Sequence, residues 1–508
     1  MSRVLGGGIA ALTLLVLVLP LAALATRVEG WSALTARDAG ALWFTLWQAA
    51  ASAALSVLLA VPVARALARR RFPGRSAVVL LLGAPFILPT IVAILGLVAV
   101  FGRGGPVNAV LGWAELPPIS VYGAGGVILA HVFFNMPLAT RLILQGWQAV
   151  PSERLRLAAS LGLPPAQMLR LVEWPMLRAV VPGIFVVIFL ICTTSFAVAL
   201  ALGGGPRATT VELAIYQAFR FDFDLGRAAI LGGLQLVLGS VAALASLSLS
   251  LPSGFGAGLD RPVARWDGRG TLPRTLDTAA IGGACLFLLT PMALILAQGA
   301  TALPSLPASV WAAAGRSLCI ALLAALTTCA AALAMALAAA RPRGGWVEIA
   351  GTVPIAASPL VLGAGLYVLI LPVANPVGLA LPVTLGVNVA LALPFALRAL
   401  LPAVRDLDRD YGRLSASLGM RGWPWLRLVA LPRLRRPLGF AAGLTAALSA
   451  GDLGVIALFA SPDQATLPLK LYQLMGAYRM ADAKAAALLL VALSLGLFWL
   501  FERSARDG

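Results

Sequence analysis

The stretch RLAASLG at residues 156–162 recurs as RLSASLG at residues 413–419, 257 positions further along a chain of 508 residues. Further along the chain the spacing falls by one residue to 256, and there Thr210 and Tyr216 match Thr466 and Tyr472. Further matches at the spacing of 257 are Pro137 with Pro394, Arg141 with Arg398, LRLV at 169–172 with LRLV at 426–429, and Pro175 with Pro432. Chance does not produce this density of matches without gaps, so we infer that the chain is internally duplicated.

The composition around the repeat is that of a membrane protein. Hydrophobic residues make up 60% of the chain and charged residues 11%, and the mean hydropathy is +0.94. A soluble domain carries about 25% charged residues, so this chain is neither a soluble enzyme nor a disordered protein. A spanning helix needs about 20 apolar residues, which leaves room for about twelve spans. We expect them at 6–25, 42–66, 78–101, 121–146, 180–202, 228–251, 276–299, 311–340, 346–373, 379–401, 438–460 and 484–502.

The basic excess indicates how these spans are oriented. The net charge of +18 comes largely from arginines in the loops after the even-numbered spans, whereas loops 300–307 and 374–381 carry no charge. Because cytoplasmic loops are enriched in basic residues, this pattern places both termini in the cytoplasm. The same enrichment explains the positive charge without a nucleic-acid partner.

The predicted fold is therefore an all-α polytopic membrane protein with two tandem six-helix repeats. The first repeat covers residues 1–251 and the second 275–508, joined by a cytoplasmic linker at 252–274 that is rich in Gly, Pro and Arg. An even number of spans gives both repeats the same orientation, so a pseudo-two-fold axis along the membrane normal should relate them. Pro85, Pro89, Pro354 and Pro359, early in matching spans, predict bent helices near the pathway or tolerated kinks.

The best-matched parts of the repeats are two cytoplasmic loops, 150–178 and 405–435. Loops normally vary more than spans, so a repeated loop suggests a contact with another protein. Each loop predicts a short helix with a smooth face, a turn at glycine and a second short helix that a proline ends. The alternative is an amphipathic helix on the bilayer surface. The candidate contact residues are Arg156, Ala158, Ala159, Ser160, Gly162 and Pro175, and Arg413, Ser415, Ala416, Ser417, Gly419 and Pro432.

Few ionisable residues lie inside the expected spans, where they are costly and mark functional sites by default. Asp452 is a candidate for the translocation path, or a carboxylate bound locally by backbone N–H groups. His131 is a second candidate, or a helix-packing residue. The remaining candidates, for an outer gate or an external protein contact, are Gly203, Gly204 and Gly205, which also read as a tight turn, and Tyr216 and Tyr472.

Binding chemistry of other kinds is not indicated. The four cysteines lie in apolar runs without CxxC spacing, and one histidine cannot build a metal site alone. No GxxxxGK[ST] phosphate-binding loop occurs in the sequence. We therefore expect no metal, no cofactor and no ATPase site in this chain.

The loop motif resembles a known family. Glycine and proline are thirteen residues apart in both loops, as in the EAA-x3-G-x9-I-x-LP motif of binding-protein-dependent ABC importer permeases. The family Glu is replaced by Arg156 and Arg413, and the first LP by Trp174-Pro175. In that family the loop is a coupling helix that docks on a cytoplasmic ATPase, and the two Arg residues put any ion pair of the family Glu in doubt.

Fused two-loop chains of this length resemble the ferric-iron and thiamine permeases. Segments similar to thiamine permeases include RRRFPGR (69–75), HVFFNMP (131–137), VEWP (172–175), LGGGPRATTVELAIYQ (202–217), GDLGV (451–455) and TLP (466–468). The resemblance implies a non-enzymatic permease of the bacterial inner membrane that moves thiamine, alone or together with its phosphates, from periplasm to cytoplasm. Implied partners are two copies of an ABC ATPase, a periplasmic solute-binding protein and membrane lipid. The alternatives are a ferric-iron permease and, in another class, an ion-coupled secondary transporter.

Overall fold

A computed structural model of the chain describes residues 2–27, 35–83, 87–203, 205–247, 267–268, 270–420, 422–459 and 461–507. Within these residues the fold is helical, without strands. Eleven helices are long and apolar enough to cross a membrane, and a bent pair raises the number to twelve. The predicted all-α polytopic architecture is thus confirmed.

The first half of the chain contains both long helices and short ones. In chain order they are α1 (Ser2–Ala25), α2 (Ala36–Arg69), α3 (Arg75–Leu81), α5 (Thr90–Phe101), α6 (Pro106–Trp113), α7 (Ala124–Gln148), α8 (Ser152–Ser160), α9 (Pro165–Met168), η2 (Leu169–Glu173), α10 (Trp174–Thr193), α11 (Phe196–Leu202), η3 (Pro206–Ala208), α12 (Val211–Arg220) and α13 (Leu225–Leu247).

The second half repeats this order. Its helices are α14 (Thr271–Ala302), η4 (Leu303–Ser305), α15 (Ala308–Ala339), α16 (Gly345–Thr352), η5 (Val353–Ala356), α17 (Pro359–Ile370), η6 (Pro376–Leu379), α18 (Ala380–Ser417), α19 (Trp423–Trp425), η7 (Leu426–Ala430), α20 (Leu431–Gly451), α21 (Gly454–Phe459), η8 (Pro462–Gln464), α22 (Leu467–Gly476) and α23 (Met480–Asp507). The corresponding pairs are α1 with α14, α2 with α15, α3 with α16, α5 with α17, α7 with α18, α10 with α20, α11 with α21, α12 with α22 and α13 with α23.

The first helix of each half packs against the other half. Helix α1 lies on α15 and α17, and α14 lies on α2 and α5 as well as on α23. Small residues permit the close approach: a Cβ on Gly6 would meet the carbonyl of Ala334, and one on Gly365 would meet that of Pro20. The two halves therefore interlock.

A buried ion cluster also ties α14 to the end of α2. The Asp277 carboxylate accepts from Arg69 Nε at 2.7 Å and from Arg70 Nε at 2.6 Å. Asp277 is buried, and removing one partner of a buried charge cluster leaves the other charge uncompensated. This cluster fixes the second half's first helix on the first half.

Four predicted spans are broken in the structure. Spans 78–101 and 346–373 become α3 with α5 and α16 with α17, the latter pair bent by 97°. Pro89 caps α5 and Pro359 begins α17, as expected of a residue that lacks an N–H and keeps the preceding residue out of helical geometry. Pro85 lies outside the described residues. Spans 180–202 and 438–460 also break, at Thr194-Ser195 and at Asp452-Leu453.

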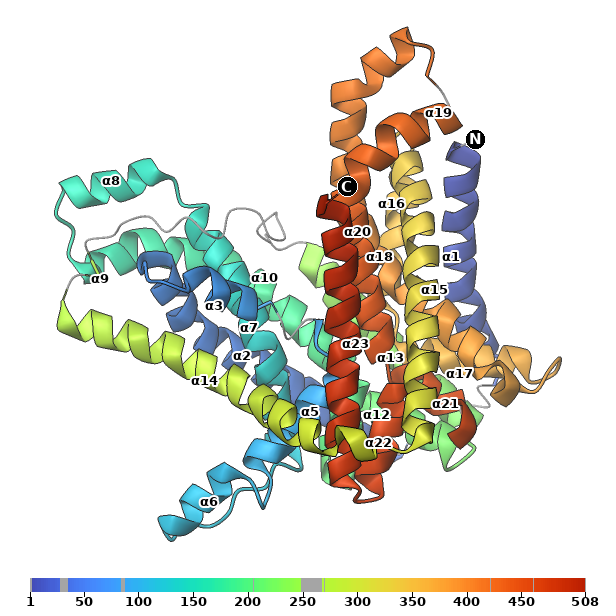
Figure 1. The fold of residues 1–508 in the computed structure, drawn as a ribbon, viewed down its shortest axis with the longest axis horizontal. Coiled ribbons are helices and arrows are strands. Elements are labelled where there is room, and N and C mark those ends of the chain that lie inside the picture. Colours follow the sequence, from blue (N-terminus) through green and yellow to red (C-terminus); the bar gives the residue numbers. More distant parts are fainter. Residues whose placement is uncertain are drawn as a thin grey trace.

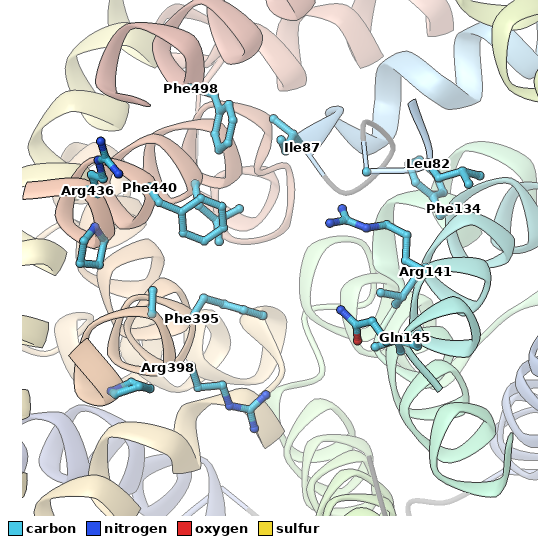
Figure 2. A pocket seen from close by; sticks show the side chains of 17 residues that line it. Leu82, Ile87, Phe134, Arg141, Gln145, Phe395, Arg398, Arg436, Phe440 and Phe498 are labelled. Carbon is cyan, nitrogen blue, oxygen red and sulfur yellow. The ribbon is translucent and has the colours of Figure 1, made fainter. Parts of the chain in front are cut away.

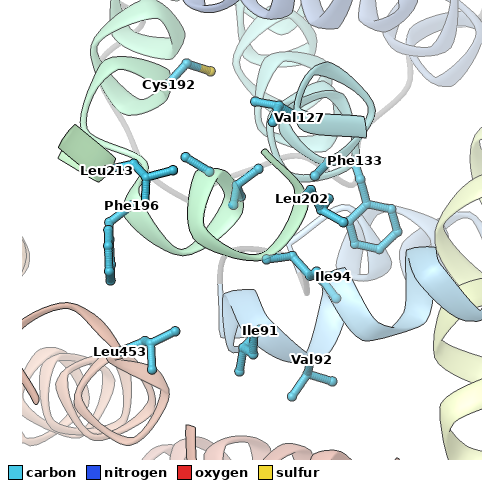
Figure 3. Close-up of a cluster of buried hydrophobic side chains, with 14 of the residues drawn as sticks. Ile91, Val92, Ile94, Val127, Phe133, Cys192, Phe196, Leu202, Leu213 and Leu453 are labelled. Atoms are coloured by element: carbon cyan, nitrogen blue, oxygen red, sulfur yellow. The ribbon is translucent and has the colours of Figure 1, made fainter. Parts of the chain in front are cut away.

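Much of the apolar core that the two halves share lies at the end of the molecule away from the two loops. Figure 1 shows α8 and α19, which belong to the two repeated loops, well apart, with both chain termini on the side of α19. At the other end, residues of both halves share one buried cluster. Leu453 of the second half joins Ile91, Val127 and Phe196 of the first (Figure 3). The two loops are thus well apart, while the halves share this apolar cluster.

Candidate functional site

Both repeated loops turn at their glycine in the same way. Gly162 has φ +59° and Gly419 has φ +65°, a left-handed conformation that favours glycine. After α8, the N–H of Gly162 donates to Ala159 O at 3.1 Å and that of Leu163 donates to Ala158 O at 3.1 Å. At the end of α18 the same two bonds measure 3.2 and 2.9 Å. This pair of bonds is the Schellman cap, and it sets the direction in which each helix end points.

The prolines act differently from the prediction. The second short helix does not end at Pro175 or Pro432; it continues into the span, with each proline in the first turn of α10 or α20. A π-helical turn precedes each proline, η2 at Leu169–Glu173 and η7 at Leu426–Ala430. The wider turn leaves room for a proline ring that would clash with the carbonyl four residues earlier.

The loops differ in how they join the preceding span. Helix α8 is separate from α7, whereas α18 runs unbroken to Ser417, so the expected short helix at 405–417 is the end of a 38-residue helix. In the first loop Glu173 is fully buried and pairs with Arg65 at 2.8 Å. The equivalent residue of the second loop is Ala430, and there Arg433 stacks on Tyr411 at 4.5 Å instead.

The exposed face of each loop differs in part from the predicted contact residues. Ala158 and Ser415 are buried, whereas Arg156 and Arg413, Ala159 and Ala416, and Ser160 and Ser417 are exposed in both copies. Beside them lie four exposed leucines that the prediction missed: Leu157 (60% exposed), Leu161 (65%), Leu414 (55%) and Leu418 (64%). The sequence feature that could have identified them is a pair of leucines four residues apart on a helix predicted outside the spans. An exposed apolar pair repeated twice is typical of a protein-docking surface.

A cavity of about 670 Å³ lies between the halves on the loop side of the core. Figure 2 shows Arg141 of α7 on one wall, facing Arg398 and Arg436 on the other. Phenylalanines complete the walls: Phe134, Phe395, Phe440 and Phe498. None of its described lining residues is acidic, and these three arginines have no ion pair among the described residues. The cavity is therefore aromatic and positively charged.

Asp452 lies beyond this cavity, in the break between α20 and α21. Its Oδ1 accepts from the N–H of Gly454 at 3.3 Å, and the Asn388 amide, oriented to satisfy both its ends, donates to Oδ2 at 3.3 Å. The position equivalent to Asn388 in the first half is His131, which is buried and contacts Ser52 through Nδ1 at 3.4 Å. Neither Asp452 nor His131 lines the cavity in this conformation.

No family model matches the chain. It is similar to the thiamine transport system permease protein ThiP of Escherichia coli, with 39% identity over 525 residues that cover 98% of this chain and 96% of the relative. ThiP of Brucella abortus is 41% identical over 475 residues, 91% of this chain and 87% of the relative. ThiP of Salmonella typhimurium is 41% identical over 478 residues, 91% of this chain and 88% of the relative. The chain belongs to the thiamine transport system permease family.

Membership of this family confirms the predicted resemblance and a multi-pass permease of the inner membrane. A ferric-iron permease and an ion-coupled secondary transporter find no support among these relatives. The relatives are named as permease proteins, which is consistent with a membrane subunit that transports its substrate and catalyses no reaction.

The predicted outer-gate residues of this permease lie at the end opposite the loops. A Cβ on Gly203 would meet the carbonyls of Ala199 and Ala208, so glycine is required there by space, and Gly205 has φ +138°. Gly204 lies outside the described residues. Tyr216 is buried against Phe196, with ring centroids 5.2 Å apart. Tyr472, its counterpart, is half-buried. A contact of Tyr216 with another protein would therefore require a conformation in which this side chain is exposed.

Proposed function

We propose that this chain is the membrane subunit of an ATP-driven, binding-protein-dependent importer. Its substrate is thiamine together with thiamine phosphates, carried from periplasm to cytoplasm. The observation that carries the proposal is the repeated, glycine-turned loop on a chain that matches thiamine permeases over almost its whole length. The orientation follows from the basic loops, which put both termini and both docking loops in the cytoplasm.

The energy comes from outside this chain. Two copies of a cytoplasmic ABC ATPase dock on loops 150–178 and 405–435, and a periplasmic solute-binding protein delivers the substrate. We propose that the chain itself needs no cofactor and no ATP site, because its sequence has no GxxxxGK[ST] loop. Repeats 1–251 and 275–508, joined by linker 252–274, rock against each other as the ATPases close and push on the loops. The splayed loop ends and the packed core at the opposite end correspond to the inward-facing state.

The positive charge of the cavity should affect thiamine and thiamine phosphates differently. A permanently cationic thiazolium gains no favourable contact with Arg141, Arg398 and Arg436, so thiamine binds this cavity weakly and its uptake should depend little on them. A phosphate group turns this interaction into an attraction, because guanidinium groups bind phosphate with charge-assisted hydrogen bonds. Phosphorylated thiamine should therefore depend on these arginines more than thiamine does.

Replacing Arg141 and Arg398 together with Gln should lower uptake of thiamine diphosphate about ten- to a hundredfold and leave thiamine uptake within about twofold. A hydrogen bond to a charged group contributes about 1.5–3 kcal/mol. Competing uptake of the two labelled compounds into vesicles measures the ratio. Arg103→Gln, an exposed arginine at the other end, is the matched control. An equal loss for both compounds would contradict a phosphate-binding role.

Asp452→Asn should weaken thiamine uptake about tenfold, because the substitution removes a negative charge beside the path and keeps the side-chain shape. Initial uptake rates over a range of thiamine concentrations measure the effect. Asp463→Asn, an exposed acid eleven residues on, should leave the rates unchanged. Unchanged kinetics for Asp452→Asn would remove this carboxylate from the pathway.

The proposed function is tested by growth. A thiamine-requiring bacterium without its own importer should grow at low external thiamine once this chain is expressed with its ATPase and binding protein. Iron uptake in an iron-transport mutant should not be restored. Restoration of iron uptake without restoration of growth on thiamine would overturn the substrate assignment.

A further inference from the structure

A buried carboxyl group joins the two halves at the end away from the loops. Glu212 lies in α12 and is fully buried. Its Oε2 accepts a hydrogen bond of 2.9 Å from the hydroxyl of Ser358, which belongs to the second half. Ser358 caps α17 by accepting from the N–H of Val361 at 3.3 Å, and it directly precedes Pro359 at the 97° bend. The bond thus crosses the interface at a point where the chain is already bent.

The second oxygen of this carboxyl group has no hydrogen-bond partner among the described residues. Neither Glu212 Oε1 nor Gln235 Oε1 has a hydrogen-bond partner among the described residues, although the two side chains are within hydrogen-bonding reach of each other. The amide nitrogen of Gln235 is engaged, donating to Thr193 O at 2.9 Å. A proton on Glu212 Oε1 would let this oxygen donate to a nearby acceptor such as Gln235 Oε1.

No cation among the described residues neutralises Glu212. At the starts of α2 and α13, Asp38 and Arg227 are paired with each other at 2.8 Å, while Arg37 of α2 and Arg220 of α12 are exposed. The arginines at the other end of α2 pair with Glu173 and Asp277. Helix α17 contributes Tyr367, whose ring packs on Phe219 at 4.8 Å, and α11 and α21 carry no titratable side chain. A fully buried carboxylate without a cation is unfavourable, which favours the neutral acid.

Asp452 is a second acid on the same bend. The position that a Cβ on Gly454 would occupy lies 3.1 Å from Pro359 Cβ and 3.5 Å from Asp452 Oδ1. Glu212 contacts Ser358, the residue before that proline. The two acids therefore flank the Ser358-Pro359 bend, beyond the arginine-lined cavity. Two acidic side chains thus lie on the bend, and arginines line the cavity toward the loops.

We propose that Glu212 is a neutral latch while the outer end is sealed and a substrate-binding carboxylate when it is open. Separation of α12 from α17 breaks the bond to Ser358 and admits water, and the proton on Oε1 passes to water. The carboxylate then faces the entrance together with Asp452 and binds an organic cation such as a thiazolium. On closing, Oε1 takes a proton back from water. This inference rests on the proposed function, because it needs a cationic substrate.

The test uses the complete importer, with its ATPase and binding protein, in proteoliposomes. Glu212→Gln can accept from Ser358 and donate to Gln235, so it keeps the latch, but it cannot ionise. Thiamine taken up per ATP hydrolysed should fall at least about tenfold, equivalent to about 1.4 kcal/mol. Asp222→Asn, an exposed acid ten residues on, is the control and should change this ratio by less than about twofold.

Ser358→Ala tests the latch separately, because it removes the bond and keeps the ionisable carboxyl group. Basal ATP hydrolysis without binding protein should rise about threefold as the sealed end loosens. The proposal would be overturned if thiamine uptake per ATP hydrolysed in Glu212→Gln stays within about twofold of the wild type. If that variant does not assemble, unchanged basal hydrolysis in Ser358→Ala overturns it instead. Absence of thiamine uptake by the wild-type importer would count against the proposed function and not against the latch.

Discussion

Valine at both Gly162 and Gly419 is expected to abolish ATP-driven uptake while the spans remain folded. Both glycines have a positive φ, +59° and +65°, which costs a residue with a side chain about 1–2 kcal/mol. A β-branched side chain is disfavoured further there. The turn must open to relieve this strain, and the Schellman bonds to Ala158 O and Ser415 O are then lost. Both docking surfaces would point away from their ATPase, so ATP hydrolysis would no longer drive movement of the halves.

The measurement compares uptake and ATP hydrolysis in the same proteoliposomes, with size-exclusion chromatography to show that the permease is folded. Gly74→Val is the matched control, since Gly74 has φ +82° with open space around it but lies outside both docking loops. It carries the same backbone cost and should keep uptake coupled to hydrolysis. Normal uptake in the double variant would contradict the assignment of these loops.

Aspartate at both Leu157 and Leu414 is expected to release the ATPase. Each leucine is more than half exposed on a repeated loop, in α8 or at the end of α18, and burying such a side chain in a complex contributes about 1.5–3 kcal/mol. Each ATPase copy loses one such contribution, which weakens its binding about ten- to a hundredfold, and a buried unpaired carboxylate weakens it further.

Co-purification of the ATPase with the tagged permease measures this loss. Leu116→Asp is the control, because Leu116 is 53% exposed but lies near α6, at the end away from the loops. Each single variant should leave one docking loop intact and retain part of the ATPase. Undiminished co-purification with the double variant would show that these leucines do not contact it.

The sequence predicted those features that depend on neighbouring residues. Continuous apolar runs located the spans, and the shared spacing of Gly162 and Gly419 located both turns, because a left-handed turn after a helix needs glycine wherever it occurs. Pro89 and Pro359 predicted the bent spans for the same local reason. Each of these signals lies within one turn of the element that it determines.

Features set by tertiary packing could not be predicted in this way. The crossing of α1 and α14 to the opposite halves depends on the surfaces of helices far apart in the chain. Glu212 and Ser358 are 146 residues apart, and nothing in the local sequence of either residue indicates the other. The unbroken helix to Ser417 was missed for a different reason: its arginines and aspartates favour a loop by hydropathy, although none of them stops a helix.

The most direct test of an ATP-driven thiamine importer is accumulation of labelled thiamine by proteoliposomes that contain the permease, its ATPase and its binding protein. We expect accumulation above the external concentration with ATP on the ATPase side, none with a non-hydrolysable analogue, and no change when ionophores collapse every ion gradient. Accumulation that continues without ATP hydrolysis and stops when an ion gradient is collapsed would contradict ATP-driven import.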